Sequence, residues 1–130
     1  MESFPQYMLK GSRGPHIALL QAVLCGLGYG GEDLVVVSQY YSAATTLGVA
    51  CFQKSCGLPR DGHLDTETRC ALDELCGFNF EAACRVVPGT TVFVQPDGSE
   101  ISWTSPAGQV AMVQTAYSGR SSGYSGGYWE

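Results

Sequence analysis

The chain is poor in charge, and positive charge is the scarcer sign. Only 15% of its 130 residues are charged, and 7 Lys and Arg stand against 12 Asp and Glu, for a net charge of −5. The absence of a basic patch argues against nucleic-acid binding, and a polyanionic partner would be repelled at long range. The hydrophobic fraction of 45% nevertheless suffices for a packed core, which argues against a disordered chain.

Long hydrophobic runs are also missing. No stretch approaches the roughly 20 apolar residues of a membrane-spanning helix, so we expect no transmembrane segment. The first residues, 1–5, show no signal peptide, although a chain whose presequence had been removed would look the same. A chain of this length fits one domain, or a small domain with an extension.

The sequence lacks the common arrangements of catalytic and metal-binding residues. His16 and His63 are its only histidines, do not form an H-x-x-x-H pair, and are interpreted as surface residues without a chemical role. Asp61, His63 and Asp65 have the alternate spacing of a calcium loop, but Leu72 stands where the bidentate acid belongs. We therefore expect a non-catalytic protein without a metal or cofactor, in which these acids form turns and helix caps.

Cysteine is present, but not in a metal-binding pattern. The six cysteines, at positions 25, 51, 56, 70, 76 and 84, form no C-x-x-C pair, and their spacing fits neither zinc nor iron–sulfur sites. An even number permits disulfides, and Cys76 and Cys84, which flank a predicted turn, are the pair that we would join. The alternative is that cysteines in helical patterns, such as Cys25 and Cys51, are small hydrophobic residues.

Residues 15–27 carry the clearest helical pattern. Apolar residues recur there at three- and four-residue steps along one helix face: Ile17, Leu20, Leu24 and Leu27. Pro15 suits the first helical position, with Ser12 or Gly14 before it as the cap, and Gly28 supplies a left-handed residue at the end. The apolar face requires a partner surface.

Two further helices are expected, and they begin 23 residues apart. Ser42 is the predicted cap of a helix over 42–55, and Asp65 the predicted cap of a helix that runs to about Leu75. Leu72 and Leu75 are expected to face inward. Because the sequence around each cap is similar, the two copies suit a compact three-helix domain with an internal pseudo-repeat.

Together these motifs resemble the small helical peptidoglycan-binding domain found beside many cell-wall hydrolases. The first helix carries the family's order of residues: Gly11, Gly14, Ile17, Leu20-Gln21, Leu24 and Leu27-Gly28-Tyr29. Phe52-Gln53 has the place of the family's Phe-Gln, and residues 58–72 match its second copy. In the first copy Ser38-Gln39 stand where the family has Asp-Gly, which predicts the loss of a turn. The resemblance covers roughly residues 9–75.

The resemblance implies a mainly α, compact three-helix domain that binds a cell-wall glycan or its peptide stem. Its core is expected to contain five large side chains: Ile17, Leu20, Leu24, Phe52 and Leu72. Exposed Tyr and Arg side chains near helix ends can stack on a sugar or pair with a carboxylate, so Tyr40 and Arg60 are the predicted ligand-binding residues. Tyr29 and Tyr41 are instead predicted to be core residues. An extracytoplasmic or organelle-lumen location is favoured over the cytosol.

The family pattern ends at residue 77. Beyond it, residues 91–95 and 99–103 alternate in period two around Pro96-Asp97-Gly98, which predicts a β-hairpin. Its expected apolar face consists of Val92, Val94, Ile101 and Trp103. Because an isolated hairpin is marginal in water, we expect this one to lie against the helical domain or a partner.

The predicted organisation therefore has four segments: an N-terminal arm over 1–10, the helical domain over 11–77, an extension over 78–117 with the hairpin at 91–103, and a Gly/Ser/Tyr-rich tail over 118–130. Tyr124, Tyr128 and Trp129 in the tail are predicted partner-docking residues, because aromatic side chains anchor interfaces. The alternative function is an accessory structural subunit that docks onto a larger protein assembly through its hairpin and tail.

Overall fold

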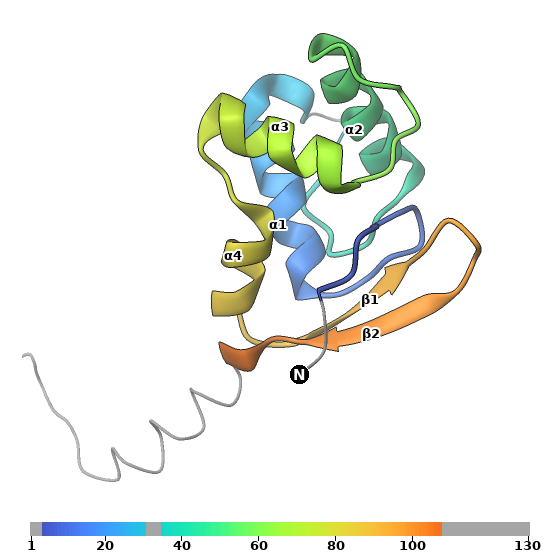
Figure 1. The fold of residues 1–130 in the computed structure, drawn as a ribbon, viewed down its shortest axis with the longest axis vertical. Coiled ribbons are helices and arrows are strands. Elements are labelled where there is room, and N and C mark those ends of the chain that lie inside the picture. The colour runs from blue at the N-terminus through green and yellow to red at the C-terminus, as the bar shows by residue number, and fades with distance from the viewer. Residues whose placement is uncertain (1–3, 31–34, 108–130) are drawn as a thin grey trace, which may run out of the picture.

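The structure, a computed structural model, describes residues 4–30 and 35–107. Its elements are α1 (Pro15–Leu24), a π-helical turn η1 (Cys25–Tyr29), α2 (Ala43–Ser55), α3 (Thr66–Cys76), α4 (Phe80–Val86), β1 (Thr90–Val94) and β2 (Glu100–Thr104). In Figure 1, α1 runs through the middle of the molecule, with α2 and α3 at one end and the antiparallel β1–β2 hairpin at the other. The mainly α fold with a C-terminal hairpin is confirmed.

The helices begin where the sequence predicts capping residues. The Ser42 hydroxyl accepts the Thr45 N–H at 3.3 Å, and the Asp65 carboxylate accepts the Thr68 N–H at 2.9 Å. These bonds satisfy N–H groups that the first helical turn leaves unpaired. Gly28, at φ 100°, has the expected left-handed conformation, but α1 itself ends at Leu24 and continues as η1.

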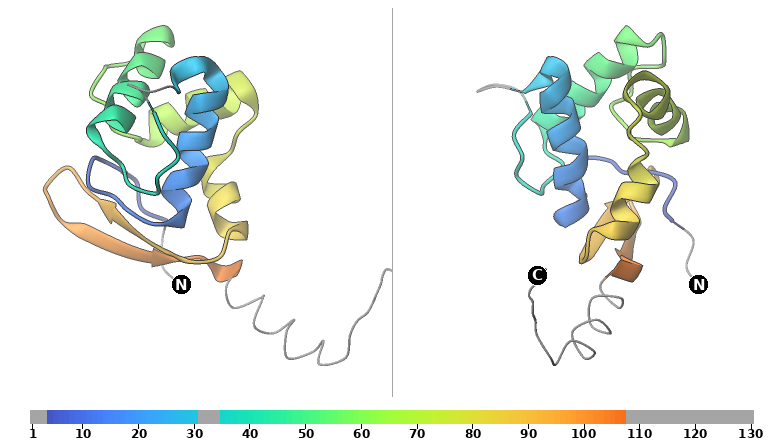
Figure 2. Two further views of the ribbon diagram at one scale, coloured as in Figure 1. Left: turned by 180° about the vertical axis from the view of Figure 1, so that it is seen from behind. Right: turned by 90° about the vertical axis from the view of Figure 1, so that its left-hand side faces the viewer.

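The segment from Met8 to Gly14 joins the parts of the fold together. Met8 exchanges two backbone hydrogen bonds with Leu64, and Arg13 exchanges two with Val92 of β1. Between them, the carbonyl of Ser12 accepts the Tyr41 N–H at 2.8 Å. This short extended segment therefore pairs in turn with the α2–α3 loop, the loop before α2 and the hairpin, and Figure 2 shows the hairpin lying close beneath the helices.

One hydrophobic core includes both the helical domain and the extension. The five predicted core residues, Ile17, Leu20, Leu24, Phe52 and Leu72, are each at most 1% exposed. They are joined by Phe80, Phe93 and Trp103 from the extension. The Phe4 ring packs edge-on against Phe93 and Trp103, with centroids 5.4 and 4.9 Å apart, so the N-terminal segment also contacts this core.

The predicted apolar face of the hairpin is wrong for its two valines, Val92 and Val94. The register pairs Thr91 with Trp103 and Phe93 with Ile101. The three-residue loop over 96–98 sets odd-numbered residues of β1 opposite odd-numbered residues of β2, and paired residues lie on the same face of a sheet. The inward face of β1 therefore consists of Thr91 and Phe93, and both are buried.

Three further predictions about single residues need correction. His16 is not on the surface but buried, whereas Leu75, expected to face inward, is 62% exposed. The disulfide between Cys76 and Cys84 is not supported, because all six cysteines lie among the described residues and all are free thiols. Cys84 is instead a core residue, and the Cys76 thiol donates to the Leu72 carbonyl at 3.1 Å.

No helix among the described residues is long and apolar enough to cross a membrane.

Candidate functional site

Gln21 on α1 holds the loop that leads into α2. Its side-chain oxygen accepts the N–H groups of Ser38 and Gln39 at 2.8 and 3.0 Å. Its amide nitrogen donates to the Tyr40 carbonyl at 2.9 Å and to the Thr45 hydroxyl at 3.1 Å. Because Gln21 is fully buried, these bonds satisfy an amide that would otherwise be costly to remove from water.

Gln53 on α2 repeats this arrangement in the loop that leads into α3. Its side-chain oxygen accepts the Gly62 N–H at 2.9 Å, and its nitrogen donates to the His63 carbonyl at 3.0 Å and the Thr68 hydroxyl at 2.9 Å. Asp61 accepts a further bond from the same nitrogen. The two buried glutamines therefore give the internal pseudo-repeat a physical basis. Each binds a threonine at the start of the next helix, and these residues, Thr45 and Thr68, are equivalent positions 23 residues apart.

The turn expected to be lost at Ser38-Gln39 is present. Gln39 has φ 67°, close to the 74° of Gly62 at the equivalent place in the second copy. Gln39 is the only residue other than glycine with a positive φ among the described residues. The Gln39 N–H donates to the Gln21 side chain, and the Gln39 carbonyl accepts the Gly14 N–H at 2.9 Å. These hydrogen bonds stabilise a positive φ, which is unfavourable for a residue with a side chain.

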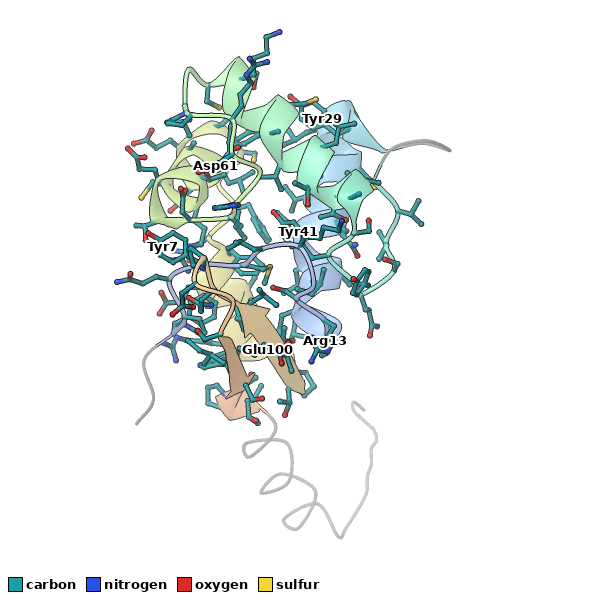
Figure 3. All side chains as sticks on the ribbon, turned by 90° about the vertical axis from the view of Figure 1, so that its right-hand side faces the viewer. Tyr7, Arg13, Tyr29, Tyr41, Asp61 and Glu100 are labelled. Carbon is teal, nitrogen blue, oxygen red and sulfur yellow. The ribbon has the colours of Figure 1, made fainter. Side chains whose placement is uncertain are left out.

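Tyr40 is placed on the surface next to an ion pair. Its side chain is 46% exposed, and its backbone forms a β-bridge with Arg13. The Arg13 guanidinium makes a two-point contact with Glu100 of β2, at 3.1 and 3.3 Å, and the two side chains lie side by side in Figure 3. Hydrogen bonding to Glu100 also raises the pKa of Arg13 above its usual value.

We call Tyr40, Arg13 and Glu100 the Tyr40 surface. It offers one aromatic face together with planar donors and acceptors, which is the combination that holds a sugar ring or a peptide carboxylate. Val36 and Val37, which precede it in the chain, are 56% and 52% exposed and add apolar area. The sequence alone does not mark Arg13 and Glu100 as site residues, because they are 87 residues apart and carry no local pattern.

The remaining candidate residues lie elsewhere. Arg60 is exposed in the loop between α2 and α3, and no hydrogen bond or ion pair in the described part of the chain joins it to Tyr40. Tyr41 is a core residue as predicted; its hydroxyl donates to the Gly62 carbonyl, and burial raises its pKa well above the usual range. Tyr29 is half-buried and packs against the core. Tyr124, Tyr128 and Trp129 lie outside the described residues.

A concave region lies along α3, away from the Tyr40 surface. Its hollow of about 470 Å³ is lined by Cys56, Leu58, Thr66, Glu67, Cys70, Ala71, Glu74 and Leu75, and we call it the α3 groove. The two carboxylates are seven residues apart on one side of α3, which corresponds to about 10 Å along the helix axis. No group of three or more His, Cys, Asp or Glu side chains among the described residues is arranged to hold a metal ion.

Comparison with known families identifies the helical part of the chain. Residues 13–72 match the family described as "Putative peptidoglycan binding domain". These residues form a peptidoglycan-binding-like domain. It contains α1, α2, both glutamine-held loops and the first part of α3, as well as Arg13 and Tyr40 of the Tyr40 surface. Among curated proteins, none matches the chain significantly.

Two solved structures are similar to the chain. One is the SleB N-terminal domain, which is 28% identical with a TM-score of 0.48 over 55% of this chain and 96% of that one. The other is an L,D-transpeptidase (residues 123–326) from Xylanimonas cellulosilytica, 28% identical with a TM-score of 0.50 over 77% of this chain. This chain spans only 50% of the transpeptidase structure. A match over 77% of 130 residues extends beyond the peptidoglycan-binding-like domain itself.

Proposed function

We propose that this protein is a non-catalytic module that binds peptidoglycan, through the cell-wall glycan or its peptide stem, in an extracytoplasmic location. The family match over residues 13–72 supports the class of ligand. The observation that carries the proposal is the exposed Tyr40 ring beside the Arg13–Glu100 pair on a domain of this family. The Tyr40 surface is the proposed contact site.

The chemistry of this surface suits a sugar better than a strongly anionic ligand. A tyrosine ring presents a flat apolar face to the C–H side of a sugar, while its hydroxyl remains free for a hydrogen bond. Arg13 and Glu100 neutralise each other, and the chain as a whole carries a charge of −5. A neutral N-acetylated glycan meets no long-range repulsion from such a protein, whereas a polyanion does.

The test is sedimentation of the full chain with purified insoluble peptidoglycan, comparing Tyr40→Ala with Leu47→Ala. Leu47 is the control because it is 51% exposed on α2 and outside the Tyr40 surface. We expect Tyr40→Ala to lower the association constant up to about tenfold, since a well-placed aromatic contact is worth about 0.5–1.5 kcal/mol. Equal losses in both variants would contradict the assignment of the surface, and an absence of binding by the unmodified chain would contradict the function.

The hairpin supports a second candidate function, docking onto a larger protein assembly. Val92 exchanges its backbone bonds with Arg13 and is paired with Ser102, so the N–H and C=O groups of Ser102 point to the opposite edge of the sheet. An open edge accepts an added strand from a partner. Deletion of residues 118–130, which removes Tyr124, Tyr128 and Trp129, separates the two functions: wall binding should survive it, and docking should not.

A further inference from the structure

A small polar hollow lies between α3 and the start of α4. We call it the Arg69 pocket; it has a volume of about 170 Å³ and is lined by Thr66, Arg69, Cys70, Asp73, Asn79, Phe80 and Glu81. A water molecule occupies about 30 Å³ of the liquid, so the hollow has room for roughly five or six non-hydrogen atoms. A ligand of this size is smaller than a sugar unit, so this pocket and the Tyr40 surface suit different molecules.

Arg69 has most of its hydrogen-bonding capacity free. Its Nη1 atom donates to the Pro5 carbonyl at 3.4 Å, and its Nη2 atom donates to the Thr66 hydroxyl at 3.2 Å. A guanidinium has five N–H donors, and none of the three ion pairs in the described part of the chain includes Arg69. Burial lowers the pKa of Arg69, although the nearby charge of Glu81 acts in the opposite direction. An anionic group that reaches this guanidinium is therefore favourable.

The same pocket contains a carboxylate without a cationic partner among residues 4–30 and 35–107. Asp73 follows Arg69 by one turn of α3 and takes part in none of the three ion pairs. The other carboxylate of the lining, that of Glu81, is paired with Arg85 at 2.8 Å. Long helical side chains point back toward the N-terminus, and Arg69 accordingly contacts Thr66 and not Asp73. A cation and an anion that do not pair with each other consequently line one hollow.

We propose that the Arg69 pocket binds a small α-amino acid in its zwitterionic form. The ligand carboxylate accepts hydrogen bonds from Arg69, and the ligand ammonium group donates to Asp73. These residues are four positions apart, about 6 Å along the helix axis, and this short span suits opposite charges that are attached to one carbon atom. Phe80, which also lines the pocket, offers an apolar contact for a side chain as small as a methyl group.

Ligands of other classes fit this lining less well. A simple anion meets the carboxylates of Asp73 and Glu81 on a chain of net charge −5, and a simple cation meets Arg69. Within a peptide, the amino and carboxyl groups of each internal residue are joined in amide bonds and carry no charge. A free α-amino acid supplies both charges at once, so this binding goes beyond the recognition of a cell-wall polymer.

Titration of the full chain with free amino acids, followed by the NMR shifts of backbone amides, tests the site. We expect saturable shifts centred on residues 66–73 and 79–81 with glycine and with at least one enantiomer of alanine. Acetate and methylammonium carry one charge, and 4-aminobutanoate carries two on distant carbons. All three should bind at least tenfold more weakly, because each loses a hydrogen bond between charged groups. Acetate that binds as tightly as alanine, or an absence of saturable shifts with all the α-amino acids, overturns the proposal.

Neutral substitutions separate the contributions of the two charges. Arg69→Gln and Asp73→Asn should each weaken alanine binding at least tenfold. The matched control is Glu74→Gln, at the carboxylate next to Asp73 that does not line the pocket, and it should leave binding unchanged. Asp73 is exposed, so Asp73→Asn keeps the test decisive even where Arg69→Gln folds poorly. Unchanged binding in Asp73→Asn, or an equal loss in Glu74→Gln, contradicts the proposed contacts.

Cys70 gives a second readout on the unmodified chain. Its thiol is exposed and lines the pocket, so saturating alanine should slow its labelling by maleimide, whereas Cys51, an exposed thiol outside the pocket, should react at an unchanged rate. A labelling rate of Cys70 that does not respond to alanine contradicts occupancy of the pocket. Neither experiment contains peptidoglycan, so a failure of this proposal and a failure of wall binding are separate results.

Discussion

Gln39 and Gly62 occupy equivalent turns with the same left-handed backbone. Glycine adopts this conformation freely, whereas a residue with a side chain pays about 1–2 kcal/mol for it. At Gly62 a β-carbon would lie 2.5 Å from the Thr46 methyl group and 3.0 Å from its carbonyl oxygen. The family pattern of Asp-Gly therefore has a steric reason in the second copy, and Gln39 tolerates the same geometry only through its hydrogen bonds.

These turns give opposite expectations for two substitutions. Gln39→Gly should raise the free energy of unfolding by about 0.5–1 kcal/mol, because relief of the strained φ exceeds the added freedom of the unfolded chain. Gly62→Ala should lower it by more than about 1 kcal/mol, since strain and the clash with Thr46 add together. Urea unfolding of both variants measures the difference, and a destabilised Gln39→Gly variant would show that the Gln39 side chain makes its own contribution.

The hydrogen-bond partners of the two buried glutamines could not be predicted from the sequence. Leu20-Gln21 and Phe52-Gln53 are visible as motifs, but their partners lie between 8 and 24 residues away. Gln53→Ala should cost about 3 kcal/mol, because it leaves the Gly62 N–H and the Thr68 hydroxyl without their partner in the interior. The matched control is Gln95→Ala, whose half-buried amide donates to the Tyr7 carbonyl and should matter less. Equal losses in urea unfolding would contradict the role of Gln53.

At the scale of elements, the three helices α1, α2 and α3 were predictable because each combines a recognisable start with recurring apolar positions. α4 was not predicted, because seven residues contain too few turns to establish a period. The hairpin followed from the Pro96-Asp97-Gly98 turn, and Gly98 has the expected positive φ of 89°. Its inward face could not be chosen correctly from apolarity alone, because Thr91 is buried and Val92 is not.

Thr91 is buried because it pairs with His16 and joins the hairpin to α1. The Nε2 atom of His16 donates to the Val87 carbonyl at 2.8 Å, since a carbonyl can only accept. Nδ1 then accepts from the Thr91 hydroxyl at 2.6 Å, and the same hydroxyl oxygen accepts the His16 N–H. The ring also packs edge-on against Trp103, with centroids 5.3 Å apart.

Replacing His16 should therefore loosen the hairpin more than the helices. We expect His16→Phe to lower the free energy of unfolding by about 2–3 kcal/mol, because the buried Thr91 hydroxyl and the partly buried Val87 carbonyl lose their partner. Hydrogen exchange should accelerate most over residues 90–104. The control His63→Phe changes a partly exposed loop histidine and should stay within about 0.5 kcal/mol of the unmodified chain. Uniform acceleration across α1, α2 and α3 would contradict a specific link between His16 and the hairpin.

For the whole molecule, the family pattern stops at residue 77 but the core does not. The contacts that attach the extension join residues far apart in the chain, such as His16 with Thr91, 75 positions apart, and Arg13 with Glu100, 87 positions apart. Local periodicity carries no information about such pairs, so a prediction made segment by segment does not find them. The peptidoglycan-binding-like domain and the hairpin consequently share one core, with Phe4, Phe80 and Trp103 at their junction.

Two buried acids in this core make the folded state sensitive to alkali. Burial raises the pKa of the Cys84 thiol to about 12, and burial also raises that of the Tyr41 hydroxyl. Unfolded cysteine ionises near pH 8.5 and unfolded tyrosine near pH 10. Above each of these values the unfolded chain has released a proton that the folded chain still holds, so stability is complete below them and falls as pH rises.

The free energy of unfolding should therefore decrease by about 1.4 kcal/mol per pH unit between roughly pH 8.5 and 10, and about twice as steeply above it. Urea midpoints measured from pH 8 to about pH 11 test this. Cys84→Ala should remove the first slope, and Tyr41→Phe should reduce the second. Both variants start from lower stability, because Cys84→Ala leaves a small cavity and Tyr41→Phe loses the hydrogen bond to the Gly62 carbonyl. Cys51→Ala, at an exposed thiol, should leave the profile unchanged. A flat profile in the unmodified chain would mean that Cys84 and Tyr41 ionise without unfolding, in conflict with a single sealed core.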